Sequence, residues 1–329
     1  MKIAVLGCGR WGSFIAWYQS EILKNDVCLW GIKGSPTYDV LEKTGKNEYV
    51  GLGKNIRLTP DLQTAVDSAE IIIISISSQN LRKFAPKVLS CGVDGKPIVL
   101  CMKGIEVETG KRLSQVMCDC GADSRNIAVW VGPGHIQEFT RGVPNCMVID
   151  SLNSELKISL AEKFKSNLIR FYYGNDLIGT EIGAAAKNVL GIAAGVLDGS
   201  GYSSLKGPLM SRGANEVGRL IKAMGGEFNS AYSLAHLGDY ETTLFSEHSQ
   251  NRRYGLMMVK GERYDKLAEG VMTSKAMKEL GEKHGVELPI TNAVYEACFL
   301  SKPFESGNGA ENCMRIILKL FDRRLKSEF

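Results

Sequence analysis

The sequence holds few of the residues from which metal centres and disulfide scaffolds are built. It has only four histidines, none with a partner at metal-ligand spacing, so we expect no bound metal. Its nine cysteines are scattered and odd in number, and Cys118 and Cys120 lack both zinc-finger spacing and a second pair nearby. We therefore expect reduced thiols and a cytoplasmic protein.

A strong excess of one charge is also missing. Lysine and arginine total 40 against 36 acidic residues, and basic pairs such as Arg252–Arg253 are isolated, which argues against a nucleic-acid or membrane-surface partner. The longest apolar run on a predicted helix, Val189–Leu197, is far below the roughly 20 residues that span a bilayer. A strand pattern begins at Lys2, so we expect neither a secretory leader nor membrane insertion. The absence of a Gly-x-Ser-x-Gly elbow excludes the commonest hydrolase pattern.

The 329 residues, of which 44% are hydrophobic, suffice for two domains that each bury a core. Up to about residue 178, short β-branched runs alternate with helical patterns, which predicts a parallel sheet covered on both faces. Beyond it the helical period dominates. We therefore expect a doubly wound α/β domain over residues 1–178 and an all-helical domain over residues 179–329. The predicted strands are Ile3–Leu6, Val27–Trp30, Ile71–Ile76, Ile98–Met102, Ile127–Val131, Cys146–Ile149 and Arg170–Tyr173. The predicted helices include Ser13–Leu23, Leu62–Ala69, Leu81–Leu89, Ser154–Lys165, Gly179–Leu197, Met210–Met224, Glu227–Ala235, Arg263–Glu269, Met272–His284, Ile290–Leu300 and Gly309–Phe321.

The first predicted strand runs directly into Gly7-Cys8-Gly9-Arg10-Trp11-Gly12 and then into a helix. In a dinucleotide fingerprint the first glycine permits a tight turn, the second lets the backbone approach a pyrophosphate, and the third lets helix and strand pack closely. The start of the helix adds N–H groups and a positive dipole end. This order predicts a site for NAD or NADP, and the alternative is a tight turn without a ligand.

The end of the second predicted strand bears on which dinucleotide binds. It reads Trp30-Gly31-Ile32-Lys33 and lacks the acid that normally holds the ribose hydroxyls of NAD. A cation without an acid suits a ribose phosphate, which favours NADP or dual use. Otherwise Lys33 is a solvated loop lysine.

Two lysines have neighbours that suggest chemistry. Lys187 lies among the small and apolar residues of Gly183–Gly195, where burial would disfavour the charged form and lower its pKa towards the range useful for proton transfer. Alternatively, Lys187 lies at the edge of the helix and its side chain extends to solvent. Lys103 follows the strand Ile98–Met102, and ligands of open parallel sheets bind beyond the carboxyl ends of the strands. It would there polarise a carbonyl oxygen, or else be a turn lysine.

Two further polar segments lie in the second half. Asp239 follows Leu237-Gly238 in a short turn, and on sequence alone a helix N-cap is its commoner role. Asn251-Arg252-Arg253 offers an amide and guanidinium groups that suit phosphate oxygens, with a solvated basic turn as the alternative.

Taken together, these motifs resemble those of the NAD(P)-dependent glycerol-3-phosphate dehydrogenases, which interconvert dihydroxyacetone phosphate and sn-glycerol 3-phosphate. The resemblance runs in order from residue 1 to about residue 320. It rests on the blocks Gly7–Ser13, Lys103–Glu106, Val131–Pro133, Lys187–Val189, Ala193–Gly195, Asp198–Gly199, Leu237–Asp239, Thr242–Thr243, Asn251–Arg253 with Gly255, and Val286–Thr291.

The resemblance implies a Rossmann-like N-terminal domain, a helical C-terminal domain and an active site in the cleft between them. It makes Lys187 the general acid and base, Lys103 the group that binds and polarises the substrate, and Asp239 the residue that orients the Lys187 ammonium. It assigns substrate binding to Asn188, Thr243, Asn251 and Arg252 as well. The cofactor positions it implies, with Lys33 added from the strand end, are Gly7, Gly9, Arg10, Trp11, Gly12, Lys33, Lys103, Gln250 and Asn251. A homodimer that supplies glycerol 3-phosphate for phospholipid synthesis is also implied.

The chain departs from the family pattern at two places. Gln250 stands where the family has an arginine that contacts phosphate and cofactor, and Gly132-Pro133-Gly134-His135 replaces the family's Gly-Pro-Ser/Thr-Phe block. His135 is interpreted as part of a repacked loop, with a new polar contact as the alternative. Both departures leave open a related dehydrogenase that acts on another 2-hydroxy acid or a sugar derivative. A protein that senses NAD(P) without turnover is disfavoured, because both lysines are present.

Overall fold

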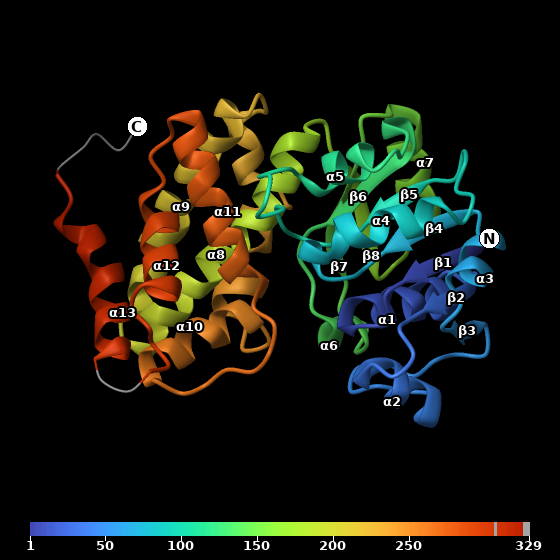
Figure 1. Ribbon diagram of the computed structural model, residues 1–329, viewed down its shortest axis with the longest axis horizontal. Helices are drawn as coiled ribbons and strands as arrows, with labels where there is room; N and C mark the ends of the chain where they lie inside the picture. The colour runs from blue at the N-terminus through green and yellow to red at the C-terminus, as the bar shows by residue number, and fades with distance from the viewer. Residues whose placement is uncertain (306–307, 325–329) are drawn as a thin grey trace. The chain divides into compact units, whose positions relative to one another are not determined.

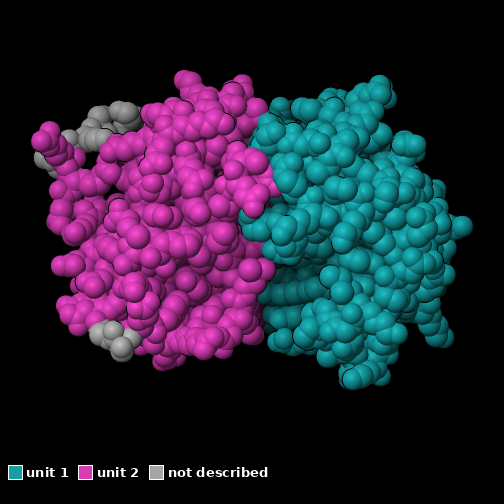
Figure 2. All heavy atoms as spheres, in the orientation of Figure 1, with its two compact units in different colours: residues 1–103, 111–177 teal, residues 104–110, 178–329 magenta. Residues whose placement is uncertain are grey.

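The computed structural model describes residues 1–305 and 308–324. Contacts along the chain divide it into two compact units, which Figure 2 colours separately. Unit 1 comprises residues 1–103 and 111–177, and unit 2 comprises residues 104–110 and 178–329. Among the described residues, no helix is both long and apolar enough to cross a membrane.

Unit 1 is built on one eight-stranded sheet in the order β3-β2-β1-β4-β5-β6-β7-β8 (Figure 1). Neighbouring strands are parallel except β6 and β7, which pair antiparallel. The strands are β1 (Lys2–Leu6), β2 (Asp26–Trp30), β3 (Ile56–Thr59), β4 (Ile71–Ile74), β5 (Ile98–Leu100), β6 (Ile127–Val131), β7 (Asn145–Asp150) and β8 (Ile169–Tyr173).

Helices cover both faces of this sheet because its central strands are apolar on both sides. Successive side chains of a strand point to opposite faces, and Val5 accordingly packs into one core while Ala4 packs into the other. The first core includes residues of α1 and α7, and the second includes residues of α3, α4 and α5. The helical segments are α1 (Arg10–Trp17), η1 (Tyr18–Ile22), α2 (Pro36–Thr44), α3 (Leu62–Asp67), η2 (Ser78–Asn80), α4 (Leu81–Leu89), α5 (Leu113–Asp119), η3 (Ser124–Asn126), α6 (Ile136–Phe139) and α7 (Ser154–Phe164).

The predicted doubly wound α/β class followed by a helical part is confirmed, with local differences in unit 1. Strand β3 was not predicted, because it is a four-residue edge strand that carries the exposed Arg57. The predicted helix Ser13–Leu23 begins earlier, at Arg10, and its last turn is the π-helical segment η1. Helices α2, α5 and α6 were also not predicted.

Unit 2 is helical and centres on α8 (Leu177–Gly199), which is buried along most of its length. Small residues such as Ala186 and Ala194 let neighbouring helices pack on every side of it. Around it lie η4 (Ser203–Leu205), α9 (Lys206–Ala223), η5 (Phe228–Tyr232), η6 (Leu237–Asp239), η7 (Glu241–Phe245), α10 (Gln250–Lys260), α11 (Glu269–His284), α12 (Pro289–Phe299), α13 (Gly309–Leu318) and η8 (Lys319–Asp322).

Two sequence predictions are wrong in this unit. The predicted helix Arg263–Glu269 is absent, since Gly261 ends α10 in the left-handed region at φ +67° and α11 begins only at Glu269. The predicted helix Glu227–Ala235 is the shorter 3₁₀ segment η5. Helix α10 itself was not predicted, although the Ser249 hydroxyl caps it by accepting the Arg252 N–H.

Candidate functional site

The three glycines after β1 have three different surroundings. Gly7 has φ +117°, and a Cβ there would lie 2.1 Å from the Ser75 carbonyl oxygen. A Cβ at Gly12 would lie 1.8 Å from the Gly7 carbonyl oxygen, so the helix can approach the strand only without a side chain. A Cβ at Gly9 would have no atom within 4 Å, which leaves open space beside the backbone. These surroundings match the turn, packing and ligand-approach roles of the fingerprint.

The beginning of α1 suits a phosphate. Gly9 is the N-cap and offers no side-chain cap, while the first N–H groups of an α-helix have no acceptor inside the helix. Arg10, the first residue of α1, donates from Nη2 to Gln137 Oε1 at 3.3 Å, and its guanidinium lies 5.1 Å from the centre of the Tyr49 ring. The residues present therefore fit the pyrophosphate of a dinucleotide.

The segment after β2 has no carboxylate at the ribose position. Gly31 packs closely there, because a Cβ would lie 2.3 Å from Cys8 Sγ. Lys33 is exposed in the following turn, and Ser35 caps α2 by accepting the Tyr38 N–H. The exposed Lys33 ammonium is compatible with both interpretations of this lysine.

Lys103 lies just beyond β5, at the carboxyl end of the sheet. Its Nζ donates to the Gly132 carbonyl oxygen at 2.8 Å, which ties it to the loop after the neighbouring strand β6. His135 in that loop is buried, and its carbonyl oxygen begins α6 by accepting the Phe139 N–H at 3.0 Å. A Cβ at Gly134 would lie 2.3 Å from the Phe139 ring, so this loop is tightly packed.

Lys187 is the centre of the polar cluster in unit 2. It is 7% exposed, and its Nζ lies 2.8 Å from Asp239 Oδ2 and donates to Thr243 Oγ1 at 2.8 Å. Asp239 is 1% exposed and also accepts from the Thr242 hydroxyl. The carboxylate stabilises the charged ammonium, which opposes the effect of burial alone. A buried ammonium held by two oxygens is equipped to deliver a proton in a fixed direction.

Backbone-to-backbone packing brings the neighbouring segments against α8. A Cβ at Gly195 would lie 2.0 Å from the Arg252 carbonyl oxygen, and a Cβ at Gly255 would lie 2.1 Å from the Ile192 carbonyl oxygen. A Cβ at Gly191 would lie 2.8 Å from Thr243 Cγ2. Glycines at these positions therefore place α10 and η7 beside Lys187.

The amides of Asn188 and Asn251 form one network. Asn251 Nδ2 donates to Asn188 Oδ1 at 3.0 Å, and Asn251 Oδ1 accepts the Gly270 N–H at 2.9 Å. A Cβ at Gly270 would lie 2.4 Å from the Asn188 carbonyl oxygen, so the start of α11 depends on this glycine as well. The structure thus brings together Lys187, Asn188, Asp239, Thr243 and Asn251 within unit 2.

Arg252 is held by an acid that the sequence prediction did not include. Its Nε lies 2.5 Å from Asp198 Oδ2, and Lys206 Nζ lies 2.7 Å from Asp198 Oδ1. Burial raises the pKa of Asp198, but hydrogen bonds from Lys206, Ser203 and Arg252 outweigh it, and the net shift is downward. The position of Arg252 is therefore set within a largely buried ion cluster.

Gln250 is engaged by its own surroundings. Its Oε1 accepts from the Tyr264 hydroxyl, and its Nε2 donates to the His248 carbonyl oxygen at 3.4 Å. The amide at the family's arginine position is thus held by neutral partners within unit 2.

Several residues that touch the predicted site were not singled out as site residues from the sequence: Asp198, Lys206, His236, Tyr240 and Gly270. Asp198 carried a signal, since the Asp198-Gly199 block belongs to the family resemblance. No comparable signal marks the others, because the fold alone brings them to α8. Among the described residues, no cluster of His, Cys, Asp or Glu side chains could hold a metal ion.

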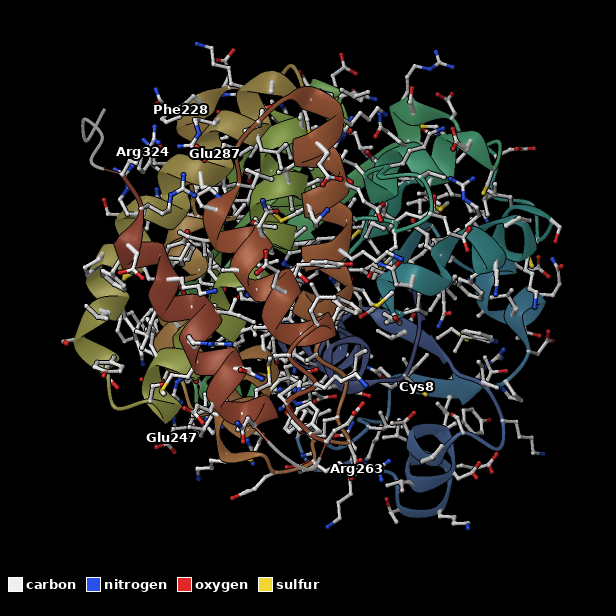
Figure 3. All side chains as sticks on the ribbon, turned by 60° about the vertical axis from the view of Figure 1, so that its left-hand side comes forward. Cys8, Phe228, Glu247, Arg263, Glu287 and Arg324 are labelled. Carbon is white, nitrogen blue, oxygen red and sulfur yellow. The ribbon has the colours of Figure 1, made fainter. Side chains whose placement is uncertain are left out.

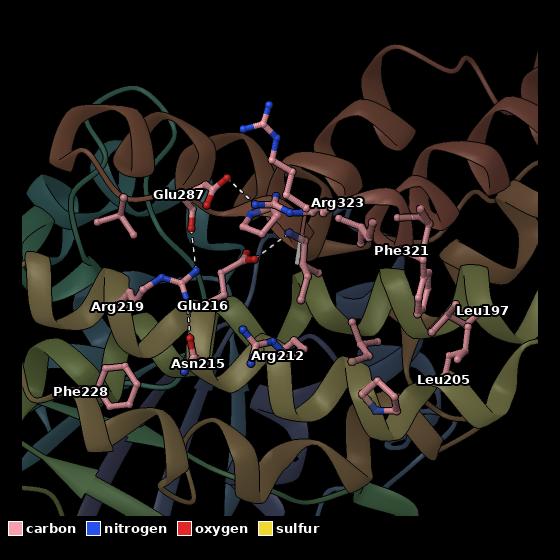
Figure 4. Close-up of a pocket in the computed structure, with 18 of the residues that line it drawn as sticks. Leu197, Leu205, Arg212, Asn215, Glu216, Arg219, Phe228, Glu287, Phe321 and Arg323 are labelled. Carbon is pink, nitrogen blue, oxygen red and sulfur yellow. Dashed lines mark hydrogen bonds and ion pairs between the residues drawn. The ribbon is translucent and has the colours of Figure 1, made fainter. Parts of the chain in front are cut away.

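A large groove of about 1140 Å³ lies elsewhere in unit 2 (Figure 4). None of the predicted site residues lines it, and its walls are formed mainly by α9, the segment 285–290 and residues 317–324. Figure 3 shows Phe228, Glu287 and Arg324 gathered on this side of the helical unit. Two of its arginines are already bound, Arg219 to the Glu287 carbonyl oxygen and Arg323 to the Glu287 carboxylate. Because none of the residues of the acid–base cluster lines the groove, the groove is separate from that cluster.

A dinucleotide-type loop followed in the same chain by a buried, carboxylate-held lysine is typical of nicotinamide-dependent oxidoreductases, which move a hydride and a proton. Comparisons narrow this class. Residues 2–157 match the family model for the NAD-dependent glycerol-3-phosphate dehydrogenase N-terminus, and residues 176–307 match the model for its C-terminus.

Individual proteins agree with the family models. Glycerol-3-phosphate dehydrogenase [NAD(P)+] of Pelodictyon phaeoclathratiforme is 34% identical over 100% of this chain and 99% of its own length. The protein of the same name from Moorella thermoacetica is 34% identical, with 92% of each chain covered. The crystal structure of glycerol-3-phosphate dehydrogenase from Coxiella burnetii superposes with a TM-score of 0.87 at 26% identity and covers 98% of this chain and 99% of its own. The chain belongs to the NAD-dependent glycerol-3-phosphate dehydrogenase family.

Proposed function

We propose that this protein interconverts dihydroxyacetone phosphate and sn-glycerol 3-phosphate with NAD(P)H or NAD(P)+. The observation that carries the proposal is the buried Lys187, held by Asp239 and Thr243, in a chain that matches the family over its whole length. The bound nicotinamide supplies or accepts the hydride.

Lys187 supplies the proton. In the reducing direction its ammonium donates a proton to the substrate carbonyl oxygen, which becomes the hydroxyl as the carbonyl carbon gains the hydride. In the oxidising direction the neutral amine takes that proton back. Asp239 and Thr243 hold the nitrogen in both directions, since both are themselves buried and hydrogen-bonded.

Lys103 has a different role. A lysine ammonium beyond the carboxyl end of β5 can draw electron density from a carbonyl oxygen, which makes the carbonyl carbon a better hydride acceptor. Its contact with the Gly132 carbonyl oxygen fixes its position at that end of the sheet.

The remaining polar residues would recognise the substrate and the cofactor. Asn188 and Asn251 would hydrogen-bond the substrate, with Asn251 also near the cofactor, and Arg252 would lie near the substrate phosphate. The pyrophosphate would be held by the loop after β1 and the start of α1, at Gly7, Gly9, Arg10, Trp11 and Gly12. Lys33 would lie near a ribose phosphate, and Gln250 would occupy a further cofactor position.

We further propose a cytoplasmic homodimer that supplies glycerol 3-phosphate for glycerophospholipid synthesis. The nine cysteines are odd in number and scattered along the sequence, which suits a reducing compartment. Light scattering of the purified protein at several concentrations would test the dimer.

The direct test is the initial rate of NADH and NADPH oxidation with dihydroxyacetone phosphate, with pyruvate and glyceraldehyde 3-phosphate as controls. Turnover with dihydroxyacetone phosphate alone is expected. Cofactor binding without turnover would refute this substrate, and the neutral surroundings of Gln250 would then favour another 2-hydroxy acid or a sugar derivative.

A further inference from the structure

His236 connects the backbone segments that carry Lys187 and Asp239. It is fully buried, and its Nδ1 lies 2.8 Å from the Gly183 carbonyl oxygen in α8. That carbonyl lies four residues before Lys187, so in an α-helix it also accepts the Lys187 N–H. At the same time the His236 carbonyl oxygen accepts the Asp239 N–H at 3.0 Å.

The second ring nitrogen of His236 extends this connection. The Tyr240 hydroxyl lies 2.7 Å from Nε2, and the two rings meet edge to face at 4.8 Å. Tyr240 is also fully buried, and its carbonyl oxygen accepts the Thr243 N–H at 3.0 Å. Both residues that hold the Lys187 ammonium, Asp239 and Thr243, are thus tied by their backbone to this pair.

The direction of each hydrogen bond follows from its partners. A carbonyl oxygen only accepts, so Nδ1 carries the proton and donates to Gly183. Burial lowers the pKa of His236 to about 4, so the ring is neutral near pH 7 and Nε2 accepts from the Tyr240 hydroxyl. The titratable groups that act on the pair are Asp239 and Lys187 on the histidine, and Glu216 and Tyr232 on the tyrosine.

A glycine makes the contact with α8 possible. A Cβ at Gly183 would lie 2.9 Å from His236 Cβ, closer than side-chain carbons approach one another. An alanine at this position would therefore push His236 away from α8, although alanine itself favours helix.

We propose that His236 and Tyr240 are positioning residues that hold Asp239 and Thr243 against the Lys187 ammonium. The proposal rests on the acid–base role proposed above for Lys187. It assigns neither residue a contact with substrate or cofactor. Its consequence is that disturbing the pair lowers the rate of proton delivery without changing any group that reacts.

The test compares Tyr240→Phe and Gly183→Ala with two matched controls. Tyr18→Phe removes another buried tyrosine hydroxyl, which donates to the Phe164 carbonyl oxygen at 2.5 Å, and Gly207→Ala adds a methyl group to a helical position with nothing within 4 Å. The readouts are kcat for dihydroxyacetone phosphate reduction between pH 6 and 10, NADPH affinity, and thermal unfolding.

We expect kcat to fall roughly three- to tenfold in each test variant, as for the loss of one buried hydrogen bond. The alkaline limb of the kcat profile should move to lower pH by roughly 0.5 to 1 unit, because a loosened carboxylate stabilises the ammonium less. NADPH affinity should be unchanged, and both controls should match the unmodified protein in kcat and in the position of the alkaline limb, although Tyr18→Phe should lower the unfolding temperature because the Phe164 carbonyl oxygen loses a donor.

The proposal is overturned if a folded test variant keeps kcat within twofold and its alkaline limb in place while Lys187→Ala is inactive. Turnover by Lys187→Ala would instead refute the acid–base role of Lys187, and the positioning proposal, which rests on that role, would be refuted with it. If Tyr240→Phe does not unfold cooperatively, Gly183→Ala and His236→Asn, which keeps an amide donor for Gly183, provide the same comparison.

Discussion

Asp239→Asn is the substitution that tests the acid–base cluster most directly. It keeps the shape of the side chain but leaves the buried Lys187 ammonium with neutral partners. Two unit charges 2.8 Å apart attract by ~6 kcal/mol at an effective dielectric constant of ~20. Desolvation of both ions offsets much of this attraction, and removing one partner is expected to lower the free energy of unfolding by about 3–5 kcal/mol.

The loss should depend on pH in a defined direction. Without the carboxylate, burial disfavours the ammonium of Lys187, so the unfolded chain binds the proton more tightly than the folded one. Stability of the variant therefore rises with pH relative to the unmodified protein. Turnover should fall at least 100-fold, because the proton donor loses both its charge and its orientation.

Urea unfolding followed by circular dichroism at pH 7 and pH 9 measures the stability, and NADPH oxidation measures kcat. Asp265→Asn is the matched control, since Asp265 pairs with Arg263 on the surface with its side chain 78% exposed, and a change below about 0.5 kcal/mol is expected there. If Asp239→Asn loses less than about 1 kcal/mol or keeps its wild-type kcat, the assigned pairing does not operate.

Four further tests have defined outcomes. Gly9→Ala should leave the melting temperature unchanged but weaken NADPH binding at least tenfold, because its methyl group occupies open space where the pyrophosphate approaches. Gly12→Ala should lower both the melting temperature and the NADPH affinity. Equal effects in the two variants would contradict the geometry. Lys33→Ala should raise KM for NADPH more than KM for NADH, and a parallel change in both constants would remove Lys33 from ribose-phosphate recognition. Gln250→Arg should leave or lower KM for dihydroxyacetone phosphate, whereas a large rise would show a site built around glutamine. Finally, unfolding free energy should fall by up to about 3 kcal/mol as pH drops from 6.5 to 4, since His236 is protonated only when unfolded, and His236→Asn should flatten this dependence.

The sequence predicted the site best at positions where only one type of residue can satisfy the local geometry. The glycines at 7 and 12 are required by a positive φ and by a 1.8 Å approach, and the fingerprint predicts both demands from spacing alone. The burial of Lys187 follows from its small neighbours, since a helix of alanine and glycine is packed on all sides.

Contacts between residues far apart in the sequence could not be predicted from local sequence patterns. The local sequence pattern favoured a helix cap for Asp239, and the pairing with Lys187 was implied by the family resemblance alone. In the structure the Asp239 carboxylate lies 2.8 Å from the Lys187 ammonium. Helix α10 was missed for a related reason, because Gly255 weakens its helical pattern yet is needed where the helix backbone meets Ile192. The edge strand β3 has too few residues for a clear alternation.

The ion cluster at Asp198 bears on how a phosphate dianion would be recognised. Asp198 binds both Lys206 and Arg252, so one negative charge faces two positive ones, and the cluster as a whole keeps a positive charge. The Asp198 carboxylate binds Arg252 at Nε and so fixes the plane of the guanidinium, while the cluster keeps its net positive charge. This arrangement suits a phosphate oxygen. Asp198 therefore positions Arg252, and under the phosphate-binding role proposed for Arg252, an arginine at position 250 would add a third cation to the two that Asp198 holds.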